Sequence, residues 1–79
     1  SYGVNSVNKE EFLQELMEIM MLEEQLAVST ELESLGAYDS MTHLTLLGIF
    51  EDEFGKEIES KDLTALKTVG DLVALAGLE

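Results

Sequence analysis

The sequence predicts an all-α fold, a four-helix bundle with three longer helices, one short helix and a long first loop. Apolar residues recur at helical spacing in three segments of the 79-residue chain. Residues that cap helices stand directly before these segments. The connections after the second and third helices are short, which favours neighbouring positions in a bundle. Each helix has to bury its apolar face against the others, because none would be stable alone.

The first helix is expected over residues 9–22, after a loose leader at residues 1–7. Asn8 and Glu11 have the spacing of a capping box, which marks a helix start. The apolar face of this helix is expected to consist of Phe12, Leu13, Leu16, Met17, Ile19 and Met20.

Residues 23–38 lack helical periodicity and predict an ordered loop, longer than most connections between helices. A short helical turn at residues 29–32 is compatible with this stretch. We expect four apolar side chains to pin the loop to the core, namely Leu26, Val28, Leu32 and Leu35.

The second helix is expected to begin at Ser40, after Asp39 as the N-cap, and to end before Gly55. Its apolar positions are Leu44, Leu46, Leu47, Ile49, Phe50 and Phe54. Gly48 lies inside the helix at a cost of about 1 kcal/mol relative to alanine. We therefore expect Gly48 to serve close packing or to leave cavity space.

The third helix is a short turn expected over residues 60–66. Thr68 opens the last helix, with Asp71 in a capping-box-like arrangement, and Gly77 closes it. The apolar stripe of the last helix is expected to contain Val69, Leu72, Val73, Leu75 and Ala76.

The composition restricts the classes of partner and site. The net charge is −13, from 17 acidic residues against four lysines, and this field repels nucleic acid and attracts basic proteins. Alternatively, the charge only keeps the protein soluble. No cysteine and a single histidine argue against a structural zinc site, and the acidic stretch at residues 51–59 does not fit a calcium loop. We expect a monomeric, cytoplasmic domain at residues 8–79, without a metal or a membrane span.

Ser40 stands where the second helix begins, so its hydroxyl should face solvent beside unpaired N–H groups at the positive end of the helix dipole. Such a position suits a phosphate diester. For His43, an exposed histidine on the helix surface is favoured over a general base. A pliable apolar interior is suggested by Met17, Met20, Met21 and Met41.

Three segments in order resemble the acyl carrier protein family. Residues 35–41, ending in Asp39-Ser40-Met41, are similar to the family's Asp-Ser-Leu attachment motif. Residues 50–58 are similar to the acidic end of its second helix, and residues 67–73 to the start of its last helix. Methionine after the serine is a variant also found in D-alanyl carriers.

The resemblance implies a bundle of the acyl-carrier type with a 4′-phosphopantetheine arm on Ser40, oriented by Asp39. A phosphopantetheinyl transferase would take the arm from coenzyme A. The arm would then shuttle thioester-linked acyl intermediates between enzymes of fatty-acid, polyketide or related biosynthesis. The chain would be no enzyme and would have no catalytic residue, because the arm and the partners supply the chemistry.

The resemblance also implies that partner enzymes with basic patches dock on the second helix. The candidate contact residues are Met41, Leu46, Leu47, Glu51 and Asp52. One alternative is an aminoacyl or D-alanyl carrier that works with an adenylating ligase. Another is an acidic helical interaction module without an arm.

Overall fold

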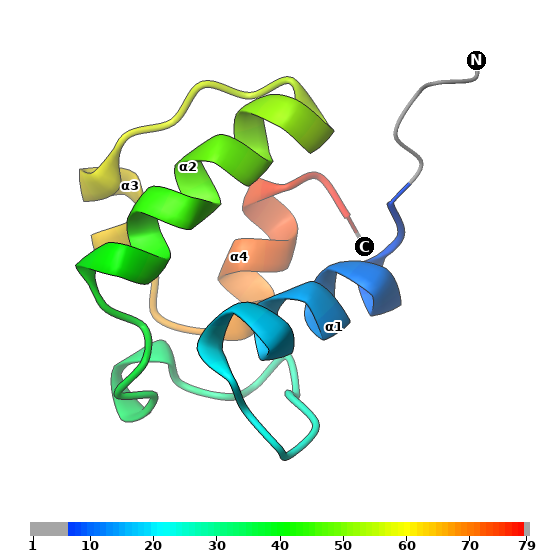
Figure 1. Cartoon of the computed structure of the whole chain (residues 1–79), viewed down its shortest axis with the longest axis vertical. Coiled ribbons are helices and arrows are strands. Elements are labelled where there is room, and N and C mark those ends of the chain that lie inside the picture. The colour runs from blue at the N-terminus through cyan, green and yellow to red at the C-terminus, as the bar shows by residue number, and fades with distance from the viewer. Residues whose placement is uncertain (1–6, 79) are drawn as a thin grey trace.

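The computed structural model describes residues 7–78 and shows an all-α fold (Figure 1). The elements in chain order are α1 (Lys9–Met20), the 3-10 helix η1 (Leu32–Ser34), α2 (Ser40–Phe54), α3 (Ser60–Thr64) and α4 (Val69–Leu75). The predicted fold class, with a long first loop and a short third helix, is confirmed. The expected leader lies outside the described residues except for Val7, which packs against the core.

The helices enclose one apolar core. In Figure 1, α1 and α2 run in roughly opposite directions, α4 lies between them, and α3 lies beside the start of α2. The largest fully buried side chains are Phe12, Phe50, Leu16, Leu32, Leu46, Leu63, Leu72 and Val69. In the part of the chain that the structure describes, no helix is long and apolar enough to cross a bilayer.

Three phenylalanine rings join α1 to α2. The ring of Phe12 meets those of Phe50 and Phe54 edge to face, with centroids 6.1 and 5.4 Å apart. Phe50 and Phe54 are 5.5 Å apart. Each such pair contributes about 0.5–1.5 kcal/mol beyond the burial of its area. The cluster therefore fixes the far end of α2 against α1.

The capping box predicted for α1 is confirmed. Asn8 Oδ1 accepts a hydrogen bond from the Glu11 N–H at 2.8 Å, and Glu11 Oε1 accepts one from the Asn8 N–H at 3.1 Å. The predicted end at residue 22 is wrong. Met21 has a left-handed backbone conformation with φ 57, and the Leu22 N–H turns back to Met17 O at 2.9 Å. This closing turn ends α1 at Met20.

Buried side chains and backbone hydrogen bonds both hold the first loop to the rest of the fold. Leu26 and Leu32 are buried and Leu35 is half-buried, as predicted, whereas the prediction for Val28 is wrong because its side chain is 46% exposed. Instead, Val28 O accepts a hydrogen bond from the Gly70 N–H at 2.8 Å. The backbone, not the side chain, of Val28 therefore holds the loop to α4.

Two further backbone bonds tie the first loop to the segment before α4. The Leu32 N–H donates to Lys67 O and the Val69 N–H donates to Thr30 O, both at 2.9 Å. The helical turn expected at residues 29–32 lies later, at η1, because residues 30–32 are extended against residues 67–69.

The bounds of α2 agree with the prediction, and Gly55 ends the helix with φ 64. One expectation inside it is wrong, and another holds in part. Leu44 is 65% exposed, because it lies two residues, or about 200° around the helix, from the buried Leu46. Gly48 is exposed, and a Cβ added there would meet nothing within 4 Å, so close packing does not require glycine. The alternative expectation of cavity space holds, because Gly48 lines a depression beside α2.

The last two helices begin where predicted. α3 ends at Thr64, earlier than expected. The capping box of α4 is confirmed, since Thr68 and Asp71 exchange hydrogen bonds of 3.0 and 3.2 Å. Bonds from the N–H groups of Thr68 and Lys67 hold the pKa of Asp71 below its ordinary value. The predicted stripe is buried except for Leu75, which is half-buried.

The methionines divide into two groups. Met17 and Met20 are buried in the core, whereas Met21 and Met41 are 86% and 75% exposed. The expectation of a methionine-rich interior therefore holds for α1 only. Met21 is turned outward by the end of α1, and Met41 lies on the exposed side of the first turn of α2.

Candidate functional site

Ser40 is the first residue of α2 and is exposed, as predicted. Asp39 caps the helix. Its Oδ1 accepts a hydrogen bond from the Thr42 N–H at 3.0 Å, and its carbonyl oxygen accepts one from the His43 N–H at 2.9 Å. The hydroxyl of Ser40 is thus displayed at the positive end of the α2 dipole. A negative group at such an exposed position gains about 0.3–1 kcal/mol.

The backbone before Ser40 is held by two side-chain hydrogen bonds that the sequence did not predict. Thr42 is buried, and its hydroxyl donates to Ala37 O at 2.6 Å. The hydroxyl of Tyr38 donates to Leu63 O in α3 at 2.7 Å. Burial raises the pKa of Tyr38 to about 12, so the phenol keeps its proton at neutral pH. These bonds fix the direction in which the chain enters α2.

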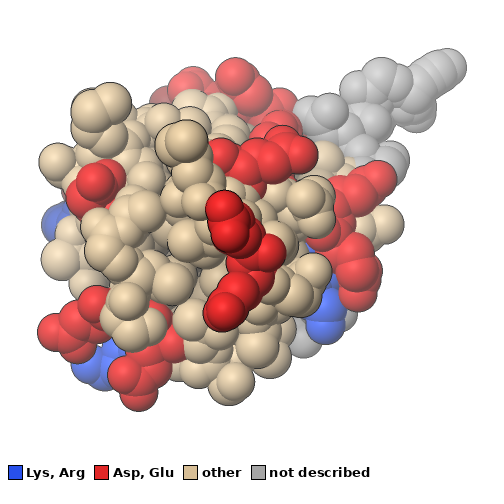
Figure 2. All heavy atoms as spheres, turned by 60° about the horizontal axis from the view of Figure 1, so that its bottom comes forward, with Lys and Arg blue, Asp and Glu red and all other residues tan. Residues whose placement is uncertain are grey.

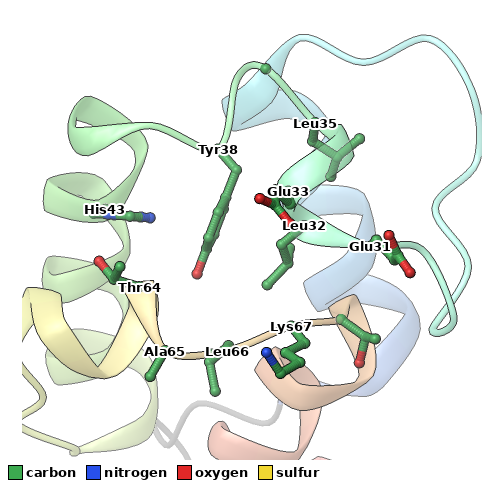
Figure 3. Close-up of a pocket in the computed structure, with 12 residues that line it drawn as sticks. Glu31, Leu32, Glu33, Leu35, Tyr38, His43, Thr64, Ala65, Leu66 and Lys67 are labelled. Atoms are coloured by element: carbon green, nitrogen blue, oxygen red, sulfur yellow. The ribbon is translucent and has the colours of Figure 1, made fainter.

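His43 is not the exposed helix-surface histidine that the sequence predicts. It is half-buried, and its ring lies edge to face with that of Tyr38 at a centroid distance of 4.5 Å (Figure 3). Its Nε2 is buried and has no hydrogen-bond partner among residues 7–78. The loop before α2 causes this burial, because it places Tyr38 against the flank of the helix.

Two depressions adjoin α2. The first, here called the loop hollow, has a volume of about 740 Å³ and lies between residues 31–38, His43 and residues 64–68 (Figure 3). The second, here called the α2 groove, has a volume of about 400 Å³. The α2 groove is lined by Leu47, Gly48, Glu51, Glu57, Ile58 and Glu59.

The structure divides the residues predicted to contact a partner. Met41, Glu51 and Asp52 are exposed, and Leu47 is half-buried in the α2 groove. The prediction for Leu46 is wrong, because its side chain is 0% exposed and packs in the core. Leu44 was missed as a surface residue. Its spacing of four from Ser40 is the signal that places both on one face of the helix.

The acidic residues at the end of α2 do not form one surface group. Glu53 is half-buried and pairs with Glu15 of α1, while its Oε1 is buried without a donor from residues 7–78. The pKa of Glu15 is raised to about 7 by burial, by the hydrogen bond with Glu53, and by the charges of Glu53 and Glu18. Below about pH 7 the Glu15 carboxyl therefore carries a proton that it can donate to Glu53.

Acidic side chains occur in several separate groups over the face shown in Figure 2. The charge of the chain is therefore spread over the surface and is not restricted to the end of α2. Within the described range, no group of three or more histidine, aspartate or glutamate residues is arranged to hold a metal ion.

A family model described as a phosphopantetheine attachment site matches residues 10–76. The match spans most of the chain, from the first turn of α1 to the end of α4, and includes the exposed serine at the start of α2. No solved structure matches the chain.

Proposed function

This chain belongs to the family of phosphopantetheine-binding carrier proteins, and on that premise we propose that Ser40 is the residue that bears the arm. Members of the family bind 4′-phosphopantetheine covalently, and such carrier domains are generally not catalytic. The bound group supplies a terminal thiol that holds cargo as a thioester. We further propose that the cargo is an acyl intermediate of fatty-acid, polyketide or related biosynthesis, passed between separate enzymes.

One observation supports Ser40 above all: its exposed hydroxyl stands at the capped start of the longest helix. Ser34 donates its hydroxyl to Glu31 O at 2.7 Å and is therefore engaged. Ser60 also begins a helix, but α3 has only five residues against fifteen in α2. The longer helix offers the stronger dipole to a phosphate diester.

Intact mass spectrometry tests the attachment residue. The protein is incubated with coenzyme A, magnesium and a phosphopantetheinyl transferase of broad specificity. We expect the mass of one arm to be added to the wild type and to Ser60→Ala, the matched control at the start of α3. Ser40→Ala should stay unmodified. A wild type that several transferases leave unchanged would favour an acidic interaction module without an arm.

A second candidate cargo is an aminoacyl or D-alanyl group loaded by an adenylating ligase. The observation that favours it is the neutral first part of α2, where residues 41–50 contain no acidic side chain. Thr42 is buried, so it presents nothing to a partner. The mass of the thioester released from carrier isolated from its own cells distinguishes the two: an aminoacyl mass would overturn acyl carriage.

We propose that basic partners dock on a surface of α2 made of the exposed Met41, Glu51 and Asp52 and the half-buried Leu47. Charges at the edge of an interface act chiefly on the association rate. The double variant Glu51→Lys, Asp52→Lys should lower the transferase rate about tenfold at low salt. This difference should shrink in high salt, because exposed charges are screened.

The control for the docking surface has the same net charge but changes acids elsewhere. Glu23 and Glu24 are exposed in the first loop. If Glu23→Lys, Glu24→Lys slows the transferase as much as the α2 variant does, the effect comes from net charge, and the docking surface is wrongly placed.

A further inference from the structure

The face of α2 that presents Ser40 has a depression on either side. At 100° per residue, His43 lies about 60° from Ser40 in one direction and Gly48 about 80° in the other. His43 is part of the wall of the loop hollow, and Gly48 is part of the α2 groove. Along the helix axis His43 lies about 4.5 Å from Ser40 and Gly48 about 12 Å. A group attached to Ser40 therefore starts within one helical turn of the loop hollow and about two turns from the α2 groove.

The two depressions differ in size and chemistry. At about 740 Å³ against about 400 Å³, the loop hollow has the larger volume, within the usual range of small-molecule sites. Its wall combines the aliphatic Leu35 and Leu66 with the hydrogen-bonding side chains of Tyr38, His43 and Thr64. The wall also contains the charged residues Glu31, Glu33 and Lys67. Figure 3 shows that these side chains come from the first loop, α2, the end of α3 and the connection between α3 and α4.

The polar side chains of the α2 groove are Glu51, Glu57 and Glu59. Ionised carboxylates only accept hydrogen bonds and repel a phosphate. The 4′-phosphopantetheine arm carries a phosphate at its root, followed by a hydroxyl and two amides that both donate and accept. The loop hollow also contains carboxylates, but the Lys67 ammonium and the His43 ring add hydrogen-bond donors that the α2 groove lacks. It therefore matches this chemistry better than the α2 groove does.

Among the residues that line the loop hollow, His43 gives the most specific reason to expect a bound group. Its Nε2 is buried without a hydrogen-bond partner in the described part of the chain, beside the ring of Tyr38. A buried polar atom left unpaired destabilises a fold unless something else satisfies it. The nitrogen is shielded from solvent in this structure, so a turn of the His43 ring toward the loop hollow would let an amide there pair with it.

We propose that the loop hollow is the resting site of the distal, amide-and-thiol part of the phosphopantetheine arm, with Tyr38 and His43 as its binding residues. The proposal rests on the proposed attachment at Ser40. Because the arm is tethered one turn away, its effective concentration at the hollow is in the millimolar range, so weak contacts suffice.

Two glycines provide a matched test. Gly36 lines the loop hollow and Gly48 lines the α2 groove, and a Cβ added at either would meet nothing within 4 Å. Gly36→Leu therefore fills the hollow and Gly48→Leu fills the groove, each without a clash at the Cβ. Ala65 is exposed in the wall of the hollow, so Ala65→Leu is a second filling variant should Gly36→Leu fail to fold.

The rate at which iodoacetamide alkylates the thiol of the loaded arm measures its protection. Filling the hollow should speed alkylation about threefold, the change expected when the hollow shelters the thiol about two-thirds of the time. Gly48→Leu should react like the wild type. In NMR spectra, the ring signals of His43 should shift between the unloaded and loaded wild type, and this shift should vanish in Gly36→Leu.

Intact mass is recorded first, so that two failures are distinguished. An unmodified wild type overturns the proposed function and this inference together. A modified protein with equal alkylation rates in all variants and an unshifted His43 overturns the inference alone. Faster alkylation in Gly48→Leu, without a change in Gly36→Leu, would place the arm in the α2 groove and would also overturn it.

Discussion

The carboxyl pair between α1 and α2 makes the stability of this protein depend on pH in an unusual direction. The pKa of Glu15 rises from its ordinary value of 4.5 to about 7 in the folded chain, chiefly through burial and then through its contact with Glu53. Between these values the native state binds more protons than the unfolded state. The contribution of Glu15 to stability is therefore greatest below pH 4.5, and it is lost as the pH rises to about 7.

The size of the effect follows from the two pKa values. They differ by about 2.5, which corresponds to about 3.4 kcal/mol if the full difference acted on stability. Glu15 is only half-buried, so solvent screens its interaction and about 1 kcal/mol is a realistic value. Glu15→Gln removes the titration but keeps an N–H donor for Glu53. We expect this variant to be about 1 kcal/mol more stable than the wild type at pH 8.

Urea denaturation at pH 5.5, 6.5, 7.5 and 8.5 measures this difference in the free energy of unfolding. The advantage of Glu15→Gln should grow with pH and level off above about pH 7. Glu18→Gln is the control, because it removes one charge from the same helix and Glu18 contributes least to the shift. A stability advantage of Glu15→Gln that is the same at every pH, or that Glu18→Gln shows equally, would refute the raised pKa of Glu15.

Two further predictions concern the residue that ends α1 and the loop that leads into α2. Met21→Gly should stabilise the fold by about 0.5–1 kcal/mol, since it relieves the left-handed backbone conformation at an 86% exposed position. Met21→Ala keeps the strain and should not stabilise the fold. Equal urea midpoints for the two variants would contradict this reason. Tyr38→Phe should lower the free energy of unfolding by about 1–2 kcal/mol, because Leu63 O loses its hydrogen-bond donor. An unchanged urea midpoint would show that this bond does not hold the segment before Ser40.

Local signals in the sequence were sufficient to locate the helix starts. Asn8, Asp39 and Thr68 each accept a hydrogen bond from an N–H group three residues later, as their spacing predicts. The end of α2 at Gly55 was equally local. Since Ser40 follows directly from Asp39, its exposed place at the start of the longest helix was also predictable.

Contacts between distant segments decided what the sequence did not. The helical period of α2 does not reveal whether Leu44 or Leu46 faces the core, because apolar residues occur around most of the helix. The partial burial of His43 depends on Tyr38, whose hydroxyl bonds to α3 at Leu63. No sequence pattern within one helical turn of His43 predicts its contact with Tyr38.

The sequence by itself determined where the helices begin and which serine stands at the start of α2, because capping and helix dipoles act over a few neighbouring residues. The tertiary structure decided what surrounds that serine, including the loop hollow and the unpaired nitrogen of His43. It also decided that Glu15 is half-buried and lies against Glu53 at the far end of α2, which raises the pKa of Glu15. Burial and pKa depend on which segments meet in space, and those meetings are fixed only when the whole core packs.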